Sequence, residues 1–169
     1  MNVPIQPVKR LLYATDLSDG ATYALRYAVR LADAVNGELH VLHALEPIST
    51  EARITLQSYI TDPRLLAQAT SRRQEMAAQM LADRQRDFWA EIGAEAEHLR
   101  ARIAAVEIVE GNPADVILRH SVAIGADMIL MGSHEHGLSH TFLGRIAQRV
   151  LRRSRIPSLV IPYPDPNID

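Results

Sequence analysis

Residues 8–44, VKRLLYATDLSDGATYALRYAVRLADAVNGELHVLHA, set the topology expected of this chain. The apolar stretch at 8–15 is typical of a short buried strand, and the polar segment DLSD after it contains residues that begin helices. Small and apolar side chains then recur at helical spacing until Asn36-Gly37, a pair that favours the left-handed end of a helix. A second apolar stretch, ELHVLHA, follows. This order predicts two parallel strands joined by a right-handed crossover.

The middle of the chain predicts a longer connection before the third strand. Residues 46–63 show no sustained period, so we expect a loop there. Residues 65–92 are rich in Ala, Gln, Arg, Met and Glu, which favours a long helix, and the third strand is expected to include 106–109. The apolar residues of the long helix that we expect in the core are Leu66, Met76, Met80, Leu81, Phe88 and Ile92.

The last third of the chain repeats the alternation of helix and strand. Asn112-Pro113 supplies a capping amide and a first-turn proline, so we expect a helix from there to about Gly125. A strand at 127–131, a helix over 139–154 and a final strand, SLVI, are expected to follow. The sequence therefore predicts an α/β protein with a Rossmann-like open sheet of five parallel strands and helices on both faces. Such sheets bind ligands beyond the carboxyl ends of their strands.

Length and composition are typical of one domain with its own core. The chain has 169 residues, of which 47% are hydrophobic. We expect an N-terminal extension at 1–7, the domain at 8–162 and a flexible tail at 163–169, because prolines crowd that end. The net charge of −2 and the pI of about 6.4 disfavour nucleic-acid binding.

Three further absences in the sequence narrow the functional classes. There is no cysteine, which excludes disulfides, thiolate zinc sites and a cysteine nucleophile and fits a reducing compartment. No apolar run approaches the roughly 18 residues of a membrane span, and the N-terminus lacks the pattern of an export signal. We therefore expect a cytoplasmic protein with no membrane partner.

Two strand ends carry polar or small residues suited to a ligand. Asp16 follows the first strand, where it is equally suited to a ribose hydroxyl or metal and to capping the next helix. Gly132-Ser133 follows the fourth strand, and Gly144 lies close to the last helix. Backbone N–H groups at such small residues are suited to a phosphate.

Three segments together resemble the universal stress protein family: ATDLS at 14–18, GNPADVI at 111–117, and ADMILMGSHEHGLSHTFLGRIAQRVLRRSRIPSLVIP at 126–162. The resemblance extends over residues 8–162 and implies the adenine nucleotide alpha hydrolase-like fold. It also implies a homodimer formed through the last strand, Ser158 to Ile161, and binding of ATP or another adenine nucleotide.

The resemblance also implies a set of site residues. Gly132 and Gly144 match the first and last glycines of the family's ATP motif, whereas Glu135 stands at its second glycine and Arg145 at its small hydroxyl residue. A carboxylate beside phosphates adds like-charge repulsion, so we expect weaker binding than with the full motif. The implied residues are Ala14, Thr15 and Asp16 along the adenosine, Ala44 near the base, and Met131, Gly132, Ser133, His134, Gly144, Arg145 and Ile146 around the phosphates.

The sequence offers little for catalysis. It contains no Gly-x-Ser-x-Gly elbow, no P-loop and no His-Glu-x-x-His motif. The loop residues His134, Glu135, His136 and His140 are donors suited to zinc or nickel, but we interpret them as exposed or phosphate-facing and expect no metal site. We expect a non-enzymatic regulatory module. The alternatives are a nucleotide-free interaction protein of the same fold, and a slow ATP hydrolase using Asp16 and His134.

Overall fold

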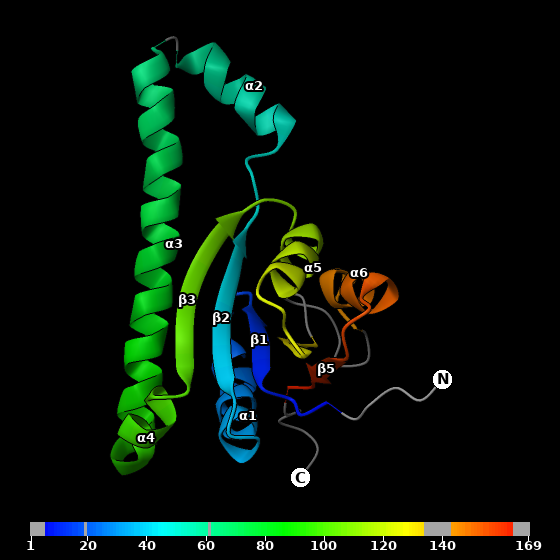
Figure 1. The fold of residues 1–169 in the computed structure, drawn as a ribbon. Coiled ribbons are helices and arrows are strands. Elements are labelled where there is room, and N and C mark those ends of the chain that lie inside the picture. Colours follow the sequence, from blue (N-terminus) through cyan, green and yellow to red (C-terminus); the bar gives the residue numbers. More distant parts are fainter. Residues whose placement is uncertain (1–5, 19, 61, 134–142, 164–169) are drawn as a thin grey trace.

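A single parallel sheet organises the protein in a computed structural model that describes residues 6–18, 20–60, 62–133 and 143–163 (Figure 1). Its five strands lie in the order β3-β2-β1-β4-β5. Their bounds are β1 Arg10–Thr15, β2 Glu38–Leu45, β3 Ile103–Glu110, β4 Met128–Gly132 and β5 Ser158–Ile161.

Helices cover both faces of this sheet (Figure 1). On one face lie α1, the C-terminal half of α3, and α4, and on the other lie α5 and α6. The predicted Rossmann-like architecture of five parallel strands with helices on both faces is confirmed. The helices are α1 Ala21–Ala34, α2 Thr50–Tyr59, α3 Pro63–Ile92, a 3-10 turn at Gly93–Glu95, α4 Ala96–Arg100, α5 Pro113–Ala123 and α6 Arg145–Arg153.

The central strand β1 is buried on both faces. Leu12 pairs with His40 of β2 on one side and with Ile129 of β4 on the other. Leu11 packs in the core under α1, Leu12 packs in the core under α5 and α6, and both are completely inaccessible to solvent. A strand with helices on both faces has no solvated side, which explains its continuous apolar run.

Helix boundaries follow the local signals in the sequence. Asn36 adopts the left-handed conformation, with φ of 49°, just after α1. The Asn112 side chain accepts a hydrogen bond from the Asp115 N–H at the start of α5, and Gly125, with φ of 64°, turns the chain after its end. The predicted ends of these two helices are confirmed.

Two predicted boundaries were wrong. Residues 50–59, expected in a loop, form α2, whose first turn is capped by the Ser49 side chain accepting from the Ala52 N–H. No residue of α2 is buried, so the helix has no apolar stripe for sequence periodicity to detect. The last helix begins at Arg145 rather than near residue 139, because Gly144 is extended, with ψ of 150°. Residues 139–142 of that expected helix lie outside the described residues.

The long helix α3 packs on the sheet only along its C-terminal half. Leu81 and Phe88 are buried there, as predicted. Met76 and Met80 were expected in the core but are 60% and 48% exposed. Ala77 and Leu81, each one residue further along the helix, are buried, so Met76 and Met80 lie off the side of α3 that packs on the sheet. The N-terminal part of α3, together with α2, extends beyond the carboxyl ends of β2 and β3 (Figure 1). The Leu66 side chain lies outside the described residues.

Asp127 joins the start of β1 to β4. Its Oδ2 accepts hydrogen bonds from the backbone N–H groups of both Arg10 and Lys9, each at 2.8 Å. These two bonds hold the pKa of the Asp127 carboxyl below its ordinary value. The carboxylate therefore stabilises the fold in its ionised form.

We predict that Asp127→Ala lowers the free energy of unfolding at pH 7 by about 1–3 kcal/mol, because two charge-assisted bonds are lost. The folded-state pKa lies below the unfolded one, so this stabilisation is present above pH 4 or so and is lost as pH falls through the folded value. Urea denaturation of wild type and variant from pH 7 down to pH 3 measures it, with Glu97→Ala as the control for an exposed acid. A difference that stays constant with pH would contradict the assignment.

Candidate functional site

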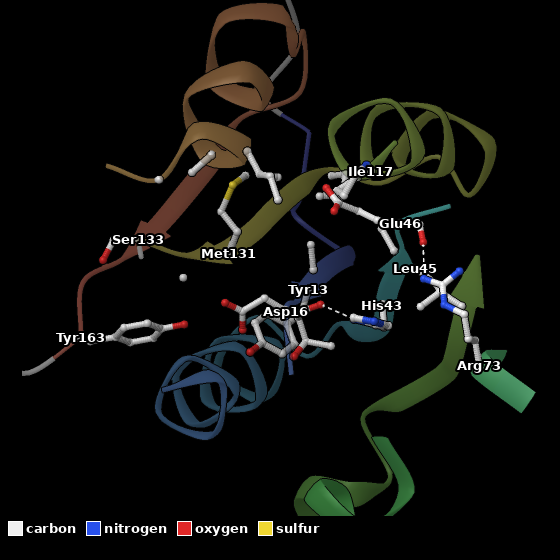
Figure 2. Close-up of a pocket in the computed structure, with 18 residues that line it drawn as sticks. Tyr13, Asp16, His43, Leu45, Glu46, Arg73, Ile117, Met131, Ser133 and Tyr163 are labelled. Carbon is white, nitrogen blue, oxygen red and sulfur yellow. Dashed lines mark hydrogen bonds between the residues drawn. The ribbon is translucent and has the colours of Figure 1, made fainter. Parts of the chain in front are cut away.

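A cavity of about 340 Å³ opens at the carboxyl ends of β1, β2 and β4 (Figure 2). The chain leaves β1 toward β2 on one side and returns to β4 on the other, so the cavity lies where the strand order switches. The residues that line it are Tyr13, Ala14, Thr15, Asp16, His43, Ala44, Leu45, Glu46, Arg73, Pro113, Ile117, Met131, Gly132, Ser133, Gly144, Ile146, Ala147 and Tyr163.

Most of the residues singled out from the sequence line this one cavity. Arg145 does not: it is the exposed first residue of α6. His134 lies outside the described residues. The predicted residues that the structure brings together are Ala14, Thr15, Asp16, Ala44, Met131, Gly132, Ser133, Gly144 and Ile146.

The turn after β1 is built by local hydrogen bonds. The Thr15 hydroxyl accepts from the Leu17 N–H at 3.2 Å, and Asp16 Oδ1 accepts from the Ser18 N–H at 2.9 Å. Leu17 adopts a left-handed φ of 60°, which is costly for leucine, yet its side chain is buried in the α1 core. Asp16 therefore caps the turn after β1 rather than helix α1, whose N-cap Gly20 has no side-chain capping bond, and it also borders the cavity.

Two side chains that the sequence analysis did not place in the site fix the end of β1. His43 stands opposite Thr15 in the β1–β2 register, and its Nδ1 donates to the Thr15 carbonyl at 2.9 Å. The Tyr13 hydroxyl donates to the Ala21 carbonyl at 2.7 Å, and burial raises the pKa of this phenol far above its ordinary value. Aligning the two predicted strands β1 and β2 in register would have placed His43 beside Thr15, and so at the site.

Glu46 and Arg73 form one end of the cavity. Arg73, from α3, donates through Nη2 to the Glu46 carbonyl at 2.8 Å, just beyond the end of β2 (Figure 2). Both side chains border the cavity close to Leu45. The sequence did not predict the contact between Arg73 and Glu46, because these residues lie on either side of α2, a helix that was not expected.

The opposite end of the cavity is formed by the end of β4 and the start of α6. The Ser133 N–H donates to the Ile161 carbonyl at 3.0 Å, and the Gly144 N–H donates to the Ser133 carbonyl at 2.8 Å. These two backbone donors, suggested by the sequence for a phosphate, are therefore already engaged. In the described chain no side chain caps α6, so the N–H groups of its first turn, at 145–147, carry the helix's positive end.

Tyr163 also lines this end of the cavity (Figure 2). Its hydroxyl lies 3.5 Å from the Ser18 hydroxyl, and its ring packs closely against Gly20 and Gly132. A Cβ atom at Gly132 would come within 2.3 Å of the Tyr163 hydroxyl oxygen. We expected residue 163 to begin a flexible tail, but its side chain packs on the α1 core, while 164–169 lie outside the described residues. The prolines on both sides of Tyr163 favour an extended tail, so the sequence did not predict that this aromatic side chain packs on the domain.

The charges around the cavity are mixed. Asp16 and Glu46 contribute carboxylates, and Arg73 contributes a cation at the Glu46 end. Among the described residues there is no group of three or more His, Asp or Glu side chains placed to hold a metal ion. His134, Glu135, His136 and His140 lie outside that part of the chain. No helix in the described portion is both long and apolar enough to span a membrane.

Comparison with known proteins places this chain among relatives over most of its length. A universal stress protein of Thermus aquaticus, from the QAH/OAS sulfhydrylase 3′ region, is 30% identical over 154 residues, covering 90% of this chain and 98% of the relative. The stress response protein NhaX of Bacillus subtilis is 28% identical over 166 residues, covering 90% and 96%.

Solved structures show the same fold. A universal stress protein in complex with cAMP superposes with a TM-score of 0.59 at 20% identity, covering 94% of this chain and 100% of the other. A universal stress protein from Archaeoglobus fulgidus in complex with dAMP gives 0.54 at 18% identity, covering 92% and 99%. A model described as the universal stress protein family matches residues 7–162. The chain therefore belongs to the universal stress protein family.

Proposed function

We propose that the protein binds an adenine nucleotide in the cavity at the carboxyl ends of β1, β2 and β4 and acts as a non-enzymatic, cytoplasmic regulatory module. The observation that carries this proposal is the position and lining of the cavity. It lies at the switch point of a parallel sheet, and its volume of about 340 Å³ falls in the range of small-molecule sites.

The wall formed by α5, α6 and the sheet suits a flat base. Ala14 and Ala44 leave room above the strands, while Ile117, Met131 and Ile146 contribute apolar side chains. Apolar walls with a few polar groups are typical of cofactor sites. Asp16 and Glu46 provide carboxylate acceptors for ribose hydroxyls or an exocyclic amino group.

The start of α6 suits a phosphate. The N–H groups of its first turn lie at the same end of the cavity as Gly132, beside the space that the Tyr163 ring fills. Two family members of similar fold were solved with cAMP and with dAMP, which are both adenine nucleotides. The alternative within the family is a nucleotide-free interaction protein.

We predict that Ala44→Leu reduces affinity for AMP by about tenfold or more, because the added atoms occupy the space assigned to the base. Isothermal titration calorimetry measures the affinity, and thermal melting confirms that the variant is folded. Ala104→Leu, an exposed alanine on β3, is the matched control. Absence of nucleotide from the purified protein, together with no binding of AMP, cAMP or ATP by the wild type, would favour the nucleotide-free alternative.

The polar groups of the described cavity do not form an acid–base pair. Among the described residues no hydrogen bond pairs His43 with Asp16 or Glu46: the His43 Nδ1–H donates to the Thr15 carbonyl, and Asp16 Oδ1 accepts from the Ser18 N–H. A general base for hydrolysis works best when a second group orients it toward the attacking water. This arrangement supports binding without turnover.

We predict that ATP incubated with the purified protein is recovered unchanged, with hydrolysis no faster than in buffer. Product analysis with labelled ATP under single-turnover conditions tests this. A steady rate that disappears in Asp16→Asn or His134→Ala while binding persists would instead assign a hydrolase.

We also propose that the protein is a homodimer formed through β5. This strand is an edge of the sheet, and Leu159 on it is 41% exposed. An open apolar edge presents unpaired backbone groups that a second copy can cover. Val160 packs against the core under α6, so Leu159 is the residue better suited to testing the interface.

We predict that Leu159→Lys converts the dimer to monomer at micromolar concentration, because a buried lysine at a paired edge is costly. Sedimentation velocity measures the shift. Val122→Lys, which replaces a valine 72% exposed on α5, should leave the dimer intact. A wild type that is monomeric throughout the micromolar range would disprove the homodimer.

A further inference from the structure

Tyr163 occupies the space that Gly132 leaves open. Its hydroxyl oxygen and ring carbons fill the position that a Cβ at Gly132 would need, and the nearest of these atoms is only 2.3 Å from that position. Gly20, at the start of α1, receives the other side of the ring, with ring carbons 2.7 Å from where its own Cβ would stand. The two glycines therefore form a slot that holds one aromatic ring.

The slot lies at the phosphate end of the proposed nucleotide site. Tyr163 lines the cavity with Gly132, Ser133 and Gly144, opposite the end formed by Glu46 and Arg73 (Figure 2). Beyond the first turn of α6, a chain of phosphates would need further donors along the end of β4. The Ser133 and Gly144 N–H groups there are already bonded to backbone carbonyls, and the ring covers Gly132.

Electrostatics act in the same direction. Asp16 lies close enough to Tyr163 to raise the pKa of its phenol, although burial is the larger cause. The Asp16 carboxylate therefore borders the same end of the cavity, where it repels additional phosphate charge. A single phosphate at the start of α6 brings less negative charge toward Asp16, and needs less of the volume beside the ring, than a di- or triphosphate does.

We propose that Tyr163 is a specificity-determining residue that limits the site to adenosine and adenosine monophosphates, with di- and triphosphates admitted only when the ring leaves its slot. This inference rests on the proposed function, and it names the ligand class of that site. The Tyr163 ring excludes the additional phosphates sterically, and it is held in place by Gly20 and Gly132, which are 112 residues apart in the sequence.

The test compares AMP with ATP by calorimetric titration of the full chain. We expect the wild type to bind AMP more tightly than ATP by about tenfold or more. Tyr163→Ala should tighten ATP binding by about the same factor while changing AMP affinity little. Tyr163→Phe keeps the ring in the slot and should retain the preference for AMP.

A second variant displaces the ring without removing it. Gly20→Ala places a methyl group where the ring packs, outside the cavity lining, and should shift the AMP-to-ATP preference in the same direction as Tyr163→Ala. Tyr59→Ala, at a tyrosine 85% exposed on α2, is the control and should match the wild type.

The outcomes separate the two proposals. Equal preference in the wild type, or an unchanged preference in Tyr163→Ala and Gly20→Ala with AMP still bound, would overturn the role of Tyr163 and leave nucleotide binding standing. Failure of the wild type and all variants to bind any adenine nucleotide would overturn the proposed function, and this inference with it.

Discussion

The double burial of β1 is the constraint on which the rest of the structure depends. Leu11 and Leu12 point to opposite faces and are both inaccessible to solvent, so helices must cover the two sides. The strand is also paired on both edges, with β2 and β4. The chain leaves the carboxyl end of β1 for α1 on one face and that of β4 for α6 on the other, and the cavity lies between the turn after β1 and the start of α6.

Elements that bury a regular face could be predicted from the sequence, and elements without one could not. The strands, α1 and α5 could be predicted from apolar periodicity and from capping residues such as Asn112. The helix α2 buries nothing, and Met76 is helical but lies off the side of α3 that buries Ala77 and Leu81. Propensity alone gives the helical state of such a segment but not its neighbours.

The candidate site divides in the same way. Residues at strand ends, such as Asp16 and Gly132, could be placed because parallel strands bring their carboxyl ends to one edge. Arg73 and Tyr163 could not, since they reach the cavity through contacts between distant segments. The family resemblance named the phosphate-binding elements, but it gave no indication that the Ser133 and Gly144 N–H groups are bonded within the chain.

Gly132 shows how one residue type serves two physical requirements. A glycine after a strand permits close approach of any group to the backbone, whether that group is a phosphate or an aromatic ring. In this chain the approaching group is Tyr163, which is held from its other side by Gly20. Gly132 therefore determines where a group can approach the backbone, and Tyr163 is the group that occupies this space. Because the ring and a phosphate chain require the same volume, the selectivity of the site depends on the free energy of seating Tyr163 relative to that of binding the additional phosphates.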